Sequence, residues 1–465
     1  MEKPIYPPGP KSVFAAYFKL YRDPLGFMAQ MGREYGDIAH LQAGRRHDYL
    51  INHPDYIKAV LLAGEDVMLR SFPRPLKRLL GSGLLTVQGE AHRCRRQLLQ
   101  PMFHQNQIAH CAGLIAEQSA RFSENWRDGQ ELDIAAEMLR LTMLVIMQAL
   151  VNQDVEEQAA KIGELLRAVL EMTHKNRVPF LDEFFSRLPL PSVNRYHRAR
   201  AQLDALMCGM IAERKEATHA RADFLTEMLQ LRDPATGARL LTDEQVRDEA
   251  MTLFAAGHET IGTALAWTWH LLALHPEVEA RLHHEVDTVL AGSTAQAKDV
   301  CQLPYTGMVL SESMRIYPPV WLMVRRPVRD FTLGEFVLPA GCYIHVSQYL
   351  THRDARFSSD PEKFDPDRWT TEAVAARPKY SYFPFGAGSR RCIGESLARM
   401  EGILILATIA QRWRFSAVPH HPVELKPFVT LHPRYGLKMS VHSRPPSSPE
   451  RILHPAAHTS TRGEH

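Results

Sequence analysis

Apolar residues recur at the helical period through most of the chain between about residues 90 and 320. The clearest helix follows Thr242, because Thr242 and Gln245 have the spacing of a capping box. It ends before His275-Pro276, since the residue before a proline avoids the helical conformation. A helix of that length rises about 48 Å, enough to cross a whole domain. A second helix over 276–290 follows at once.

Strand-like alternation is confined to short stretches at 37–41, 47–52, 331–333 and 342–346. Helices therefore outnumber strands heavily, and the pattern predicts a mainly α fold with a minor β part. No repeat or linker interrupts the chain, so we expect a single domain over 1–442. The segment 443–465 is rich in Ser, Pro and His, and we expect a disordered tail there.

The composition is that of a globular protein, with 45% hydrophobic residues, 8% aromatic residues and a net charge of +3. This charge is too small to indicate a nucleic-acid or membrane-surface partner. The 6 cysteines form no CxxC pair, which argues against a zinc site or a disulfide scaffold and fits a reducing compartment. The N-terminus has no apolar signal core, and the longest apolar run, 141–151, is too short to span a membrane. We therefore expect a soluble, cytoplasmic protein.

One cysteine, Cys392, stands before an apolar helix and behind a loop rich in glycine and arginine. A helix N-terminus, nearby cations and loop amides all favour the thiolate form of such a residue. Thiolate is a strong electron-donating ligand for the iron of a porphyrin. Taken alone, a cysteine at such a position is more often a small buried apolar residue.

The spacing Phe385-x-x-Gly388-x-Arg390-x-Cys392-x-Gly394 resembles the heme-binding signature of the cytochrome P-450 family, and the resemblance extends from about residue 5 to 440. It implies the cytochrome P-450 fold, with a long central helix over heme and small β-sheets. It also implies heme b (iron protoporphyrin IX), with Cys392 as the axial thiolate ligand of the metal and with Phe385 and Gly394 against the cofactor. Absence of a spanning segment points to the soluble bacterial type.

The long helix contains the acid–alcohol pair Glu259-Thr260 beside Gly257, which costs about 1 kcal/mol relative to alanine in a helix. Thr260 can bond a carbonyl one turn back and widen the helix locally. The resemblance implies catalytic roles in oxygen activation, with Thr260 as hydrogen-bond donor and Glu259 in a proton relay. An alternative is that Gly257 and Gly262 serve close packing and that Glu259 is simply solvated.

Glu312 and Arg315 lie three residues apart, which on residue types alone is typical of a surface ion pair. The resemblance implies instead a buried pair with Arg368 as its third member, in a structural role. It further places His92, Arg96, Arg325 and Arg390 at positions that bind the heme propionates, although Arg326 competes with Arg325. We expect the remaining cations of this face to steer an acidic electron donor, or else to be merely solvated; they are Arg93, Arg95, Arg391 and Arg399.

Apolar residues around these motifs outline a substrate pocket, with a mobile access lid predicted over 179–185. The pocket candidates are Phe72, Leu76, Leu253, Phe254, Ala256, Val320, Trp321, Leu322, Val429 and Thr430.

The resemblance implies a monooxygenase that inserts one oxygen atom from O2 into an apolar molecule by hydroxylation or epoxidation. A terpenoid, a fatty acid and a steroid all fit. Because no flavin or nicotinamide motif occurs in the chain, a separate ferredoxin- or flavodoxin-type donor and its reductase must supply electrons. We expect a monomer. Two alternatives remain: a peroxide-dependent heme-thiolate peroxygenase, and a heme-thiolate sensor or carrier.

Overall fold

The computed structural model describes residues 6–151, 156–175, 190–217 and 223–445. The predicted lid over 179–185 and nearly all of the predicted tail lie outside these residues.

Helices make up most of the described chain, so the mainly α expectation is confirmed. The long helix α12 begins after the capping box formed by Thr242 and Gln245 and ends at Leu274, as the sequence predicts. The α-helices are α1 Val13–Arg22, α2 Pro24–Tyr35, α3 Pro54–Leu62, α4 Arg74–Leu80, α5 Gly89–Leu99, α6 Gln105–Ser123, α7 Ile134–Val151, α8 Glu156–Lys175, α10 Pro191–Glu216, α11 Phe224–Gln230, α12 Asp243–Leu274, α13 Pro276–Leu290, α14 Pro304–Ile316, α15 Gln348–Thr351, α16 Thr371–Ala376 and α17 Glu395–Ala410. Short 3-10 helices are η1 Gln100–Phe103, η2 Ala297–Gln302, η3 Pro366–Trp369 and η4 Gly388–Arg390.

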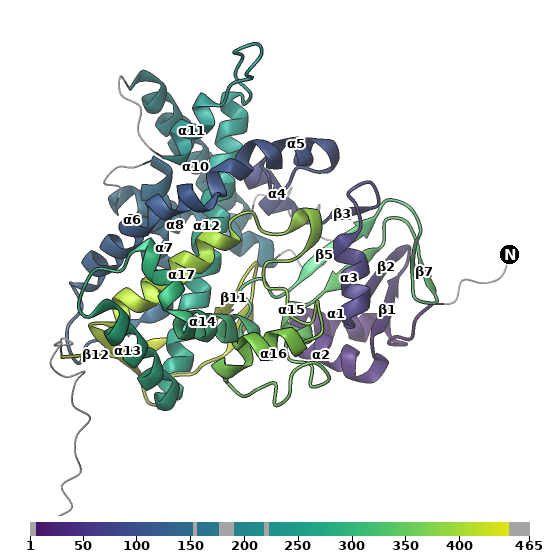
Figure 1. Cartoon of the computed structure of the whole chain (residues 1–465). Helices are drawn as coiled ribbons and strands as arrows, with labels where there is room; N and C mark the ends of the chain where they lie inside the picture. Colours follow the sequence, from purple (N-terminus) through teal and green to yellow (C-terminus); the bar gives the residue numbers. More distant parts are fainter. Residues whose placement is uncertain (1–5, 152–155, 176–189, 218–222, 446–465) are drawn as a thin grey trace, which may run out of the picture.

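Helix α12 lies in the middle of the helical body, in contact with α7 and α17 (Figure 1). The approach to α7 is close because α12 carries glycine at the contact. A Cβ atom at Gly257 would lie 2.9 Å from Ile146, and one at Gly262 would lie 2.8 Å from the hydroxyl of Thr142. Gly257 and Gly262 therefore allow the close packing of α12 against α7.

Helix α7 includes the apolar run over 141–151 but begins earlier, at Ile134. Its 18 residues, with a mean hydropathy of 1.8, are long and apolar enough to cross a membrane by length and composition. The apolar run itself is too short to span, but the helix is longer because it takes in the residues before that run. However, 61% of its residues are buried inside the protein, against α6, α8 and α12, which makes it a core helix.

The largest sheet lies to one side of the helical body, beside α1, α2 and α3, in the strand order β1-β2-β8-β5-β3 (Figure 1). A separate hairpin, β10–β11, is fastened to α12, since the indole N–H of Trp267 donates to the Leu431 carbonyl at 2.7 Å. The strands are β1 Ile38–Ala43, β2 Arg46–Ile51, β3 Met68–Arg70, β4 Glu131–Asp133, β5 Met323–Pro327, β6 Phe331–Leu333, β7 Phe336–Leu338, β8 Tyr343–Val346, β9 Trp413–Ala417, β10 Leu425–Pro427, β11 Leu431–Pro433 and β12 Lys438–Ser443.

Candidate active site

A largely apolar cavity of about 660 Å³ lies between α12, the loop before α17, α5, strand β5 and the β10–β11 hairpin. It brings together most of the residues that the sequence singles out. The motif residues on its wall are His92, Arg96, Glu259, Thr260, Arg325, Phe385, Arg390, Cys392 and Gly394.

Cys392 reaches this cavity from a tightly folded loop. Its backbone N–H donates to the Phe385 carbonyl at 2.9 Å. Gly386 and Gly388 have φ angles of 71° and 68°, in the left-handed region that favours glycine. A side chain at Gly388 would also collide with the Leu61 carbonyl. The glycines of the motif are therefore required by the loop that presents the sulfur.

The pKa of the Cys392 thiol departs from the sequence expectation. Burial and the carboxylate of Glu395 raise the pKa of the thiol. Their effect exceeds that of the Gly394 amide, Arg70 and Arg96, which lower the pKa. Cys392 is exposed and lines the cavity. The helix terminus and arginines alone thus do not make the thiolate, whereas direct coordination deprotonates a thiol outright.

Several cations gather at one edge of the cavity. Arg325 is 4% exposed, and its contacts are the Val324 carbonyl at 3.3 Å and the sulfur of Met323 at 4.0 Å. Burial, together with nearby Arg390, lowers the pKa of Arg325 to about 10. Within the described ranges no carboxylate forms an ion pair with Arg325. Its neighbour Arg326 points to the other face of β5 and donates to the Gly341 carbonyl, so only Arg325 meets the cavity.

Glu65, which was not predicted from the sequence, partly neutralises the positive charge of these arginines. Its carboxylate lies 2.5 Å from Arg390 Nη2 and 2.5 Å from His92 Nδ1, and it also accepts the N–H of Gly89 at 2.8 Å. Burial, and to a smaller extent the charge of Arg390, lowers the pKa of His92 to about 4. No spacing or motif marks an isolated glutamate for this role.

The cation-rich edge fits the two propionates of heme. Arg70, Arg96, Arg325 and Arg390 surround Glu65, which leaves an excess of positive charge. The Nε atom of Arg390 is buried and has no hydrogen-bond partner among the described residues. Arg96 donates to the Arg391 carbonyl at 2.7 Å, which fixes it beside the cysteine loop. Added carboxylates would satisfy these groups.

The acid–alcohol pair of α12 lies on the cavity wall. Thr260 Oγ1 donates to the Ala256 carbonyl at 2.9 Å, the bond one turn back that the sequence suggests. Glu259 is 6% exposed, so the alternative of a solvated carboxylate is wrong. Its Oε1 atom accepts from Thr430 Oγ1 at 3.0 Å and contacts His432 Nε2 at 2.8 Å. His432 was not foreseen, because nothing in the sequence pairs it with a residue so distant along the chain.

Glu401 on α17 is a second buried carboxyl group that sequence reasoning missed. It lines the cavity at 6% exposure, and burial raises its pKa to about 8. Its Oε1 atom has no hydrogen-bond partner in the part of the chain that the structure describes.

Of the predicted pocket residues, only Phe254 does not line the cavity. Leu253, Ala256 and Thr260 share one face of α12, whereas Phe254 is turned about 100° from Leu253 and is fully buried in the helical core. The others lie on the wall: Phe72, Leu76, Leu253, Ala256, Val320, Trp321, Leu322, Val429 and Thr430.

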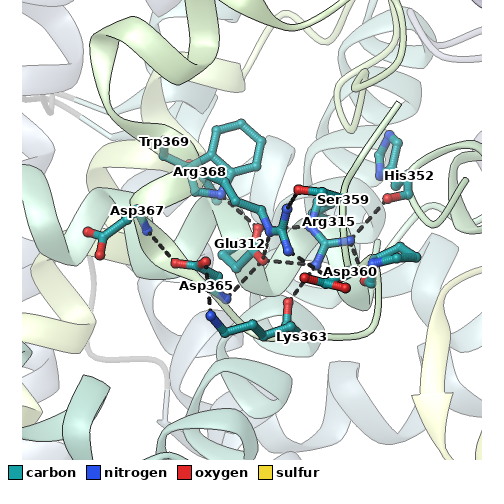
Figure 2. Close-up of polar contacts among 12 residues, drawn as sticks. Glu312, Arg315, His352, Ser359, Asp360, Lys363, Asp365, Asp367, Arg368 and Trp369 are labelled. Carbon is teal, nitrogen blue, oxygen red and sulfur yellow. Dashed lines mark hydrogen bonds and ion pairs between the residues drawn. The ribbon is translucent and has the colours of Figure 1, made fainter. Parts of the chain in front are cut away.

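Glu312 and Arg315 of α14 lie outside the cavity and are both buried, so the pattern of a surface pair does not apply. Arg368 approaches Glu312 Oε1 at 3.3 Å, and the indole N–H of Trp369 donates to Oε2 at 2.9 Å. Figure 2 shows Glu312 at the centre of these contacts. Arg315 also donates to the Pro361 and Lys363 carbonyls, at 2.7 and 3.0 Å. The group thus ties α14 to the irregular segment before the cysteine loop.

The predicted docking surface is smaller than expected. Arg95 is buried and pairs with Glu249 of α12 at 2.7 Å, so it does not belong to an exposed basic surface. Arg391 and Arg399 share Glu395, at 2.6 and 3.2 Å. Arg93 is exposed and pairs with Glu90.

Comparison with known proteins agrees with this arrangement. A family model described as cytochrome P450 matches residues 6–439. The chain is 36% identical over 415 residues to cyclooctat-9-en-7-ol 5-monooxygenase of Streptomyces melanosporofaciens, covering 89% of each chain. It is 31% identical to pentalenene oxygenase of Streptomyces avermitilis, covering 94% of this chain and 97% of the relative.

The fold is also similar to that of the retinoic acid-bound cyanobacterial CYP120A1, with a TM-score of 0.86 at 24% identity, covering 95% of this chain and 100% of the other. The family carries heme ligated by a cysteine thiolate, and its members use O2 and electrons from redox partners to oxidise organic substrates. The chain belongs to the cytochrome P450 family of heme-thiolate monooxygenases.

Proposed function

We propose that this enzyme hydroxylates or epoxidises a terpenoid, with heme held by Cys392. The observation that carries the proposal is that Cys392, Thr260 and the cation-rich edge all open onto one apolar cavity. Phe385 and Gly394 would lie against the cofactor beside the sulfur. His92, Arg96, Arg325 and Arg390 would bind its propionates. When bound, heme would activate O2, from which the substrate receives one oxygen atom.

Protons would reach the cavity through Glu259 and Thr260. The Thr260 hydroxyl is held by the Ala256 carbonyl and lies on the cavity wall, where it orients water or oxygen by hydrogen bonding. An acid–alcohol pair of this kind supports a reaction that consumes protons. A peroxide-dependent enzyme would need no such supply, because peroxide brings its own protons, electrons and oxygen. A heme sensor would have no use for it either.

A neutral substrate fits the cavity better than a fatty acid. Arg46 lines the cavity and could bind a carboxylate, but it already makes a two-point contact with Asp48, at 2.6 and 2.8 Å. The names of two relatives denote oxidation of cyclooctat-9-en-7-ol and of pentalenene. A polycyclic terpene or terpene alcohol is therefore the substrate class that we propose.

The electron donor would be a ferredoxin or a flavodoxin, supplied by its own reductase. Arg93, Arg391 and Arg399 provide cationic groups near the cysteine loop for an acidic donor, although each is already paired with a glutamate. We further propose that the enzyme is a monomer in the cytoplasm.

A ligand screen tests the substrate class. Purified enzyme would be titrated with cyclic terpenes, terpene alcohols, fatty acids and steroids while the low- to high-spin shift of the heme absorbance is followed. We expect cyclic terpenoids to give the largest shift and to yield oxygenated product with ferredoxin, reductase and reduced nicotinamide. Equal turnover with hydrogen peroxide alone would favour the peroxygenase. Carbon monoxide binding without consumption of reduced nicotinamide would favour the sensor.

A further inference from the structure

The carboxyl group of Glu259 is held from the β10–β11 hairpin rather than from its own helix. Both of its hydrogen-bonded neighbours, Thr430 and His432, meet the same oxygen, Oε1. Within the described residues no hydrogen bond engages Oε2. Glu259 also lines the cavity, so one oxygen is anchored to the hairpin while the other is left for a partner in the cavity.

The exposed fraction of the side chain is larger for His432 than for Glu259. The His432 side chain is 18% exposed, whereas that of Glu259 is 8% exposed. Thr430, which contacts His432 Nε2 at 2.8 Å, is 2% exposed. Imidazole is also the side chain that exchanges protons most readily near neutral pH. A proton from solvent therefore meets His432 before it meets Glu259.

The charges around Glu259 come from two elements. His258, its neighbour on α12, is buried and holds Phe254 O through Nδ1 at 2.7 Å, and burial lowers its pKa. His432 is the titratable group that faces Glu259 from the hairpin. Burial alone would raise the pKa of Glu259, but His432, His258 and Thr430 together hold it below its ordinary value. Glu259 is thus held as a carboxylate, the form that can accept a proton.

We propose that His432 is a positioning residue that loads Glu259 with the protons used in the cavity. In the transfer, the Nε2–H bond of the imidazolium breaks and an Oε1–H bond forms, which leaves neutral imidazole and a carboxylic acid. Glu259 then releases the proton to water beside Thr260, and solvent reprotonates His432. This inference rests on the relay role proposed for Glu259, and it adds the residue that supplies that relay.

Two variants separate charge from hydrogen bonding. His432→Gln keeps a neutral donor, whereas His432→Lys keeps a cationic one. His421→Gln is the control, because His421 contacts the Gly436 carbonyl and not Glu259. Infrared difference spectra of the reduced carbon monoxide complex would follow the Glu259 carboxyl, identified with Glu259→Gln. In His432→Gln we expect the pKa of Glu259 to rise, because burial is no longer opposed by the imidazolium. His432→Lys and His421→Gln should titrate like the wild type.

The second readout is coupling, the product formed per reduced nicotinamide consumed, with the terpenoid that gives the largest spin shift. We expect coupling in His432→Gln to be about tenfold lower than in the wild type. Wild-type carboxyl titration and coupling in His432→Gln would overturn the inference. Full coupling in Glu259→Gln would instead remove the proposed relay itself, so the two failures are distinguishable.

Discussion

Glu312 and Arg315 form a two-point ion pair inside the protein, with Arg315 Nε 2.8 Å from Glu312 Oε2 and Nη2 2.9 Å from Oε1. Glu312 is 0% and Arg315 3% exposed. Such a pair adds little stability compared with apolar residues packed in its place, but removing one partner leaves an uncompensated buried charge. We therefore expect these residues to hold the fold together and to have no direct part in the reaction.

Arg315→Lys tests this expectation. Lysine cannot reproduce the forked contact with Glu312 or the bonds to the Pro361 and Lys363 carbonyls. We expect a loss of about 1–3 kcal/mol in the free energy of unfolding by urea, because lysine keeps the charge but leaves buried acceptors without donors, and we expect reduced heme content. Arg281→Lys is the control, because its pair with Asp367 is solvent-exposed and worth at most about 1 kcal/mol. Equal losses in both variants would contradict the structural role.

Arg325→Ala should weaken heme binding, because the propionates would lose a buried cation that has no carboxylate partner among the described residues. A charge-assisted hydrogen bond of about 1.5–3 kcal/mol corresponds to roughly a tenfold to hundredfold increase in the rate of heme transfer to apomyoglobin. Arg326→Ala should leave that rate unchanged, since Arg326 lies on the opposite face of β5. Identical rates for the two variants would remove Arg325 from the cofactor site.

Thr260→Ala should bind heme and substrate normally but divert electrons to hydrogen peroxide, because the hydroxyl that orients proton donors is lost. We expect product per reduced nicotinamide to fall about tenfold or more while peroxide rises. Thr268→Ala is the matched control, because Thr268 makes the same bond one turn back, to the Ala264 carbonyl at 2.7 Å, within the core. Full coupling in Thr260→Ala would exclude its role.

Glu401 gives the fold a pH dependence. Burial raises its folded-state pKa from 4.5 to about 8, so between these values the folded protein retains a proton that the unfolded chain has lost. Stability should therefore fall as pH rises from about 5 to 8, by at most about 4 kcal/mol. Glu401→Gln should lack this part of the decline in melting temperature. Parallel curves for wild type and variant would show that Glu401 does not ionise in this range.

The sequence predicted those elements whose ends or turns are marked by particular residues nearby in the chain. The capping box at Thr242 and the His275-Pro276 stop place α12 correctly, and the glycines of the cysteine loop are needed for its backbone geometry. Phe254 was misplaced because apolar residues on adjacent helix faces look alike until the packing partners are known. Helix α7 extends beyond the apolar run that marks it, since its first turns are not purely apolar.

Long-range charge pairing could not be read from the chain. Glu65 meets Arg390 across 325 residues of sequence, and Glu259 meets His432 across 173. No spacing rule connects such residues, because the contact exists only once the sheet, hairpin and α12 are assembled. The thiol of Cys392 illustrates the same limit: the nearby cations were visible in the sequence, but the burial that outweighs them was not.

The most direct test of the account is the absorbance of the reduced carbon monoxide complex. Cys392→Ala should lose the band at about 450 nm that thiolate ligation of heme produces. Cys301→Ala, which changes an exposed cysteine far along the chain, should keep it. Survival of the band in Cys392→Ala would show that another residue ligates the iron and would contradict the site described above.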